Sequence, residues 1–163
     1  MEFWDAIAQS DLALGLRESE FAFPTLESIH LIGVAIFFGS IVMVDLRLLG
    51  LGRTLSIKRL AHYALPLTWI GFALQLASGI PLFIASADQY VRTVSFPLKM
   101  ALIVAGGVNM IIFQFTTWRH VDEFDQRRET PDGARIAGLI SVAIWVGAII
   151  AGRWIGYERR PVF

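Results

Sequence analysis

Two ionisable residues, Glu27 and His30, stand three residues apart at the start of a long apolar stretch. On a helix this spacing places both side chains on one face, with His30 about one turn deeper. A carboxylate and an imidazole so placed can bind a copper or iron ion, and we treat both residues as candidate metal ligands. Di-iron helix bundles use Glu-x-x-His twice, together with two further Glu residues. This chain lacks the rest of that pattern, so a complete di-iron site would have to be shared between subunits.

A second interpretation makes His30 the axial ligand of haem b. The flat apolar ring of haem fits between membrane helices, and its propionates attract cations near the membrane interface. Lys99 and Arg153 are predicted at the depth of His30, and Tyr157 closes the same apolar run as Arg153. Met100, beside Lys99, is the candidate second ligand of a His/Met pair. These five residues are therefore the predicted cofactor-binding set, with haem b as the cofactor.

Other roles for these residues stay open, including a protein with no cofactor. His30 can hydrogen-bond a neighbouring helix or relay protons. Lys99 and Arg153 can reach lipid headgroups from helix ends, as long basic side chains commonly do. The remaining histidines, His62 and His120, are predicted on the opposite side of the membrane. They cannot complete a site at His30 across about 30 Å of hydrocarbon.

Four uncharged runs must position these residues. The chain has 163 residues, of which 55% are hydrophobic and 17% charged, and its mean hydropathy of +0.59 exceeds that of a soluble domain. Each run approaches the roughly 20 residues that cross a hydrocarbon core, and the alternation of a membrane barrel is missing. We predict an all-α integral membrane four-helix bundle. It forms a single transmembrane domain over residues 1–163, with spans at about 28–50, 62–87, 97–118 and 135–156.

The segments outside the spans are short. Residues 1–17 carry apolar side chains at roughly helical spacing, which predicts an N-terminal interfacial helix. Residues 122–133 mix both charge signs and end in turn residues, which predicts a solvated cytoplasmic loop without chemistry. The chain has no cysteine, so disulfides and thiolate metal sites are excluded. No soluble-enzyme motif or catalytic residue is predicted, and whether the protein is an enzyme stays open.

Basic residues predict the orientation. Eight lie in the two loops on one side: Arg47, Arg53, Lys58, Arg59, Arg119, Arg127, Arg128 and Arg135. Six lie on the other side: Arg17, Arg92, Lys99, Arg153, Arg159 and Arg160. The positive-inside rule therefore places both termini outside the cytoplasm. The 14 basic residues cancel the 14 acidic ones, so nucleic acid is not an expected partner.

Small residues recur four positions apart within the spans. The pairs are Ala35 with Gly39, Ala101 with Ala105, Gly147 with Ala151 and Ala148 with Gly152. This spacing lets membrane helices approach closely. Besides the lipid bilayer, we therefore expect the partner to be a second copy of the chain or a larger membrane complex.

Several segments resemble a bacterial family of small four-span membrane proteins of unknown function. The most specific are residues 17–30, RESEFAFPTLESIH, and residues 45–50, DLRLLG. The others are Gly33, Gly39, Ser78, Gly79, Phe83, residues 96–99, Asn109, Ser141, Trp145, Gly152, Arg153 and Tyr157. That family is distantly similar to the copper-resistance D type, which implies metal or haem handling. A second histidine expected late in the third span is replaced by Phe113, Gln114 and Phe115, which departs from a bis-histidine pattern.

The sequence thus favours a small membrane redox or metal-handling protein, similar to b-type cytochromes, that binds haem through His30 near the outer interface. The alternative, from a different class, is a cofactor-free accessory or scaffold subunit of a membrane complex. A third reading, a proton or ion pathway through Glu27, His30 and Asp45, would need a continuous polar line across the bilayer.

Overall fold

The computed structural model describes residues 2–127 and 130–158, and this part of the chain is helical without a strand. Four long helices are apolar enough to cross a membrane. They are α3 (Ala22–Leu48), α4 (Ile57–Ala85), α6 (Ser95–Phe115) and α8 (Asp132–Glu158). The shorter helices are α1 (Glu2–Ala8), α2 (Asp11–Glu18), α5 (Ala87–Tyr90), η1 (Trp118–His120) and α7 (Val121–Arg127). The predicted all-helical class with four long apolar helices is confirmed.

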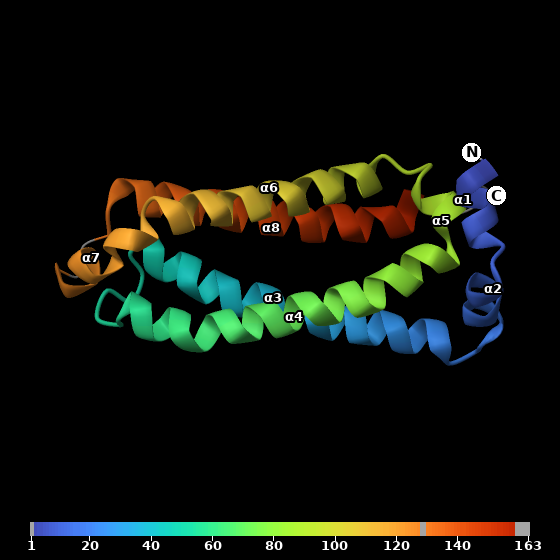
Figure 1. Cartoon of the computed structure of the whole chain (residues 1–163), viewed down its shortest axis with the longest axis horizontal. Helices are drawn as coiled ribbons and strands as arrows, with labels where there is room; N and C mark the ends of the chain where they lie inside the picture. The colour runs from blue at the N-terminus through green and yellow to red at the C-terminus, as the bar shows by residue number, and fades with distance from the viewer. Residues whose placement is uncertain (1, 128–129, 159–163) are drawn as a thin grey trace.

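The long helices form two antiparallel pairs (Figure 1). One pair is α3 with α4, the other is α6 with α8, and the two pairs meet mainly along α3 and α8. Helices α1, α2 and α5 gather at one end of the bundle, here the terminal end, and α7 lies at the opposite end (Figure 1). Because α3 and α6 begin at the terminal end while α4 and α8 finish there, His30 and Lys99 both lie toward that end.

The α3–α4 pair crosses closely at two glycines. A Cβ atom on Gly71 would lie 2.5 Å from the backbone nitrogen of Phe37 and 2.9 Å from the carbonyl oxygen of Gly33. Only a residue without a side chain allows the two backbones to approach this far. From the sequence, Ala35 and Gly39 were predicted to lie at a close contact between helices. In the structure Ala35 is exposed, and no atom lies within 4 Å of the Cβ position of Gly39. The contact is therefore made on another face of α3.

Three aromatic rings fill the middle of the bundle. The Phe37 ring lies edge-on to Trp145 of α8 at 4.5 Å between centroids, and 6.0 Å from Phe72 of α4. Gly106 makes room for this layer, because a Cβ atom there would lie 2.6 Å from Cζ2 of the Trp145 indole. We call Phe37, Phe72 and Trp145 the aromatic layer; with Gly106 it brings all four long helices together.

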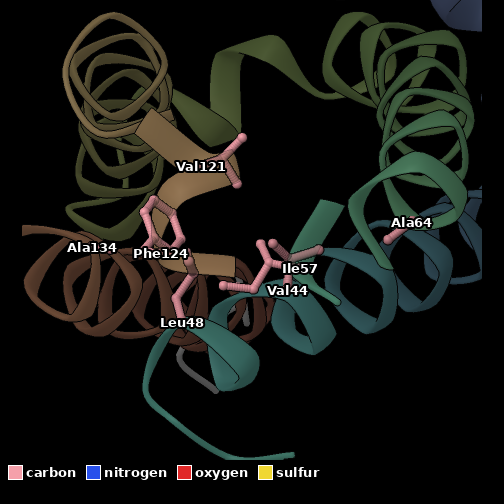
Figure 2. Packing of buried hydrophobic residues seen from close by; sticks show 7 residues of the cluster. All are labelled: Val44, Leu48, Ile57, Ala64, Val121, Phe124 and Ala134. Carbon is pink, nitrogen blue, oxygen red and sulfur yellow. The ribbon is translucent and has the colours of Figure 1, made fainter. Parts of the chain in front are cut away.

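An apolar cluster closes the α7 end (Figure 2). Its buried members come from α3, α4, α7 and α8: Val44, Leu48, Ile57, Ala64, Val121, Phe124 and Ala134. Residues 122–127 were predicted to be part of a solvated loop, and that prediction is wrong for α7. Phe124 is the reason, since its burial in this cluster holds the segment against the bundle as a helix.

Two carboxylates each cap a helix that is distant in sequence. Asp125 accepts hydrogen bonds from the backbone nitrogens of Ile57 at 2.8 Å and Lys58 at 3.3 Å, at the start of α4. Glu158 accepts from the backbone nitrogens of Val94 and Ser95 at the start of α6. Helix N-termini carry unpaired N–H donors and a positive dipole end, so both carboxylates stabilise the helices they touch.

Each of the four long helices begins before its predicted span. The length of an apolar run reflects only the part of a helix that lies in the hydrocarbon core. The helices themselves begin earlier, so that α3 includes Glu27 and α4 includes Lys58 and Arg59. The predicted N-terminal helix is divided into α1 and α2, because Ser10 caps α2 by accepting from the backbone nitrogen of Ala13.

Candidate functional site

The imidazole of His30 is half-buried on α3 and points at α4. Its Nδ1 lies 3.1 Å from the Oγ of Ser78. Ser78 is only 1% exposed, so this contact is shielded from the surroundings. The ring also interacts with the backbone of Gln75, one turn away on the same helix. These contacts with Ser78 and Gln75 fix one side of the His30 ring against α4.

The partner of Ser78 determines how the His30 proton is arranged. The Ser78 hydroxyl donates to the carbonyl oxygen of Leu74 at 2.6 Å. A hydroxyl has one proton, so its oxygen must act as the acceptor toward His30. Neutral His30 consequently carries its hydrogen on Nδ1, and Nε2 is left with a free lone pair. Such a second contact that sets the tautomer is characteristic of histidines that ligate metal ions.

Two further features of α4 shape the surroundings of the ring. A Cβ atom on Gly79 would lie 3.1 Å from Cε1 of His30 and 3.3 Å from Nδ1, so only glycine leaves the imidazole unhindered. The side-chain nitrogen of Gln75 is buried and has no hydrogen-bond partner among the described residues. A buried donor without an acceptor is uncommon in proteins and marks a position where a bound group could supply one.

Lys99 is the predicted cation that does face the interior. Its aliphatic chain crosses Gly152, where a Cβ atom would lie 3.4 Å from Nζ and 3.5 Å from Cε. It is close enough to His30 for the two side chains to interact electrostatically. Among the described residues no carboxylate forms an ion pair with it. We call His30, Ser78 and Lys99 the His30 layer.

The other predicted site residues lie on the outside of the bundle. Glu27 and Met100 are exposed, and neither is brought into the His30 layer. Arg153 and Tyr157 are also exposed, and the guanidinium of Arg153 lies over the Tyr157 ring at 5.2 Å from its centroid. Arg153 and Tyr157 thus form a cation–π pair on the exposed side of α8. Of the five predicted cofactor-binding residues, the structure brings His30 and Lys99 together.

A second set of polar residues lies on the far side of the aromatic layer. Ser40 and Thr68 pair at 2.8 Å between their oxygens, and Asn109 donates to the carbonyl oxygen of Ala137 at 3.2 Å. Asp45 is 4% exposed and interacts with Ser141 of α8. We call Asp45 and Ser141 the Asp45 layer. Because the three aromatic rings separate it from His30, the described side chains form no continuous polar line across the bundle.

The remaining histidines lie at the α7 end, as predicted. His62 is exposed near the start of α4, and His120 is exposed in η1, where it lines an open hollow with Arg53 and Arg135. The charge of Arg135 is compensated by Asp132 at 3.5 Å. Within residues 2–127 and 130–158 there is no cluster of three or more His, Asp or Glu side chains that could hold a metal ion.

Several residues with structural roles near these layers or at the α7 end were not predicted from the sequence. Ser78 and Gly79 stood out only through the family resemblance, and Asp125 was placed in a loop without a role. The missing signal for each is a contact between helices, which no spacing within one helix reveals. For Ser78 the available signal was its place one position before Gly79 in an otherwise apolar run.

The described part of the chain is all-helical and has four helices long and apolar enough to cross a membrane, which is consistent with a multi-pass membrane protein. A family model matches residues 20–158, and the chain belongs to that family, described as a family of unknown function (DUF6644). Comparisons with curated proteins and with solved structures found no match.

Proposed function

We propose that this protein is a small membrane redox protein, similar to b-type cytochromes, in which His30 binds haem iron. The observation that carries the proposal is the relay from His30 Nδ1 to Ser78 and on to the Leu74 carbonyl oxygen. It leaves Nε2 as a free ligand atom on a ring that is held in place from behind. An axial histidine needs both properties, a fixed orientation and an unprotonated nitrogen.

Haem fits the available ligands better than a bare ion does. A copper or iron ion bound by the protein alone needs several ligands, and Glu27 is exposed rather than directed at the interior. No larger group of carboxylates and imidazoles exists among the described residues. Haem brings four nitrogens of its own, so one protein ligand can hold it. When bound, haem would supply one-electron redox chemistry.

The surrounding residues divide into those that support the proposal and those that do not. Lys99 supplies a cation at the depth of His30, suited to a propionate, and the unpartnered Gln75 donor offers a further polar contact. Met100 is exposed and gives no support to a His/Met pair. Arg153 and Tyr157 are exposed as well, and we propose that they act at the membrane interface. We therefore propose His30 as the single axial ligand from this chain, with any second ligand coming from another subunit.

The test is an absorption spectrum of protein purified in mild detergent after expression with added haem precursor, together with iron and copper analysis. We expect a Soret band and about one iron per chain or per dimer. His30→Ala should remove or shift the band. The matched control His62→Ala, at the exposed histidine of α4, should leave the band unchanged. A colourless, iron-free wild type that is folded and monodisperse would overturn the proposal.

We further propose that the protein lies in a bacterial inner membrane with both termini in the periplasm. Support comes from the excess of basic residues in the sequence segments of the α7 end. Because the chain has no cysteine, single cysteines can report the side directly. Ser10→Cys should react with an impermeant thiol reagent in intact spheroplasts, whereas Thr54→Cys should react only after lysis. The reverse pattern would invert the proposed orientation.

A second candidate function, a scaffold subunit, draws support from α6. This is the least buried of the four long helices, and the small residues Ala101 and Ala105 lie exposed on it. The scaffold function predicts that association with a second copy or with a larger complex persists in His30→Ala. Ala101→Phe should weaken that association, measured by cross-linking in native membranes. An association that survives Ala101→Phe unchanged would place the contact on another helix.

A further inference from the structure

Asp45 is the most completely buried acidic side chain among the described residues whose oxygen lacks a partner. The residue is 4% exposed, and its Oδ2 has no hydrogen-bond partner in the described part of the chain. It lies where α3 passes α8 most closely: a Cβ atom on Gly138 would be 3.1 Å from the Asp45 carbonyl oxygen. A carboxyl group is thus enclosed at a tight helix crossing.

Among the side chains that the structure describes, no positive charge is paired with this carboxyl group. Arg47 lies two residues further along, but its guanidinium donates to the carbonyl oxygen of Leu55 at 2.7 Å and lies 3.9 Å from Asp125. On α8 the neighbour is the hydroxyl of Ser141, and Arg135, which lies six residues earlier on that helix, pairs with Asp132. On α4 the only histidine, His62, is exposed. No charged side chain on α4 or on the described part of α7 is recorded as interacting with Asp45.

Apolar groups lie on both sides of the carboxyl along the bundle, and the Ser40 and Thr68 hydroxyls on the same side of the aromatic layer pair with each other. Toward the α7 end lies the cluster that includes Val44 and Leu48, the residues directly before and one turn after Asp45 (Figure 2). Toward the terminal end lies the aromatic layer of Phe37, Phe72 and Trp145. An isolated charge in such surroundings is strongly disfavoured, so the carboxyl must hold a bound cation or a proton.

From this geometry we propose that Asp45 is a proton-binding site in the interior of the bundle. Its ligand is a proton rather than a metal cation, because Asp45 and Ser141 provide fewer oxygen atoms than the coordination shell of a hard cation requires. The site is independent of the haem proposed at His30, from which the aromatic layer separates it.

Infrared spectroscopy of the purified protein tests this directly. Exposed carboxyl groups are ionised at neutral pH, so a C=O stretching band of a protonated carboxyl reports only buried acids. We expect the wild type to show this band at neutral pH, with a shift in D₂O and a loss as the pH is raised. Asp45→Asn should lack it, and Asp122→Asn, which changes an exposed acid of α7, should retain it. A wild type without the band, or an Asp45→Asn variant that keeps it, overturns the proposal.

Two additional measurements keep the test decisive. Ser141→Ala should retain the band at a shifted frequency, because the hydrogen bond from Ser141 perturbs the carboxyl group. An unshifted band assigns the signal to another acid and overturns the proposal.

Addition of sodium at constant pH should leave the band unchanged. Loss of the band on sodium addition identifies a metal cation as the ligand and overturns the proton assignment. Asn matches Asp in shape, and thermal unfolding of each variant confirms that it is folded.

Discussion

The Nδ1 atom of His30 and the Oγ atom of Ser78 lie 3.1 Å apart and join α3 to α4, although the two residues are 48 positions apart in the sequence. The contact is directional, because the Ser78 proton is already donated to the Leu74 carbonyl oxygen. It therefore sets both the position of the imidazole and the nitrogen that carries its hydrogen. Any ligand of His30 must use Nε2.

Ser78→Ala should release this arrangement without removing the ligand. Loss of a second contact to a metal-ligating histidine commonly lowers metal affinity or activity by about 10- to 100-fold. We expect weaker haem retention together with a mixture of both His30 tautomers in the haem-free protein, where ¹⁵N NMR of the imidazole measures the tautomer. Ser28→Ala is the control, because Ser28 is exposed and bonds only its own helix at Pro24. A tautomer ratio that does not change in Ser78→Ala would contradict the relay.

The sequence was sufficient for the four long helices because twenty or so apolar residues in a row have few other stable conformations in lipid. It also predicted His30 near one interface and the other two histidines, His62 and His120, on the opposite side. Lys99 was placed correctly beside His30 by depth alone. Depth along the membrane can be read from the distance of a residue to the end of its apolar run.

Direction around the helix axis could not be read in the same way. Lys99 and Met100 are adjacent and share a depth, yet Lys99 turns inward and Met100 outward. Both faces of a membrane helix are apolar, so the hydrophobic periodicity that orients a helix in a soluble protein is weak here. The contact between Phe124 and the bundle was missed for a related reason, since one apolar residue among charges carries little signal.

Gly71→Ala tests the close crossing of α3 and α4. The added methyl group would lie 2.5 Å from the backbone nitrogen of Phe37, so the helices must move apart. We expect a loss of about 1–3 kcal/mol in unfolding free energy, the usual range for overpacking. Gly39→Ala makes the same change on α3 where no atom lies within 4 Å, and should be neutral or slightly stabilising. Equal stabilities of the two variants in detergent unfolding would contradict the crossing.

Asp125→Ala tests the link between α7 and the start of α4. The variant loses the acceptor for the Ile57 and Lys58 nitrogens and leaves Arg47, which is 2% exposed, without its nearby anion. We expect roughly 3 kcal/mol of destabilisation, more than a helix cap alone contributes and less than a fully buried ion pair. Asp122→Ala removes an exposed ion pair with Lys58 and should cost under about 1 kcal/mol. Thermal unfolding of both variants provides the comparison, and similar losses would argue against a structural role for Asp125.

Gly79→Ala tests whether the His30 ring requires the space above α4. The methyl group would lie 3.1 Å from Cε1 and 3.3 Å from Nδ1 of the imidazole, closer than ordinary contact, so the ring must shift by a few tenths of an ångström. Alanine is the better helix former, and the helix itself should not lose stability. We expect an altered Soret maximum or reduced haem retention at nearly unchanged thermal stability. Gly156→Ala is the control, since its Cβ position near the end of α8 has no atom within 4 Å. A normal haem spectrum in Gly79→Ala would show that haem binding does not depend on the placement of His30. The haem ligand would then have to be sought on a helix other than α3.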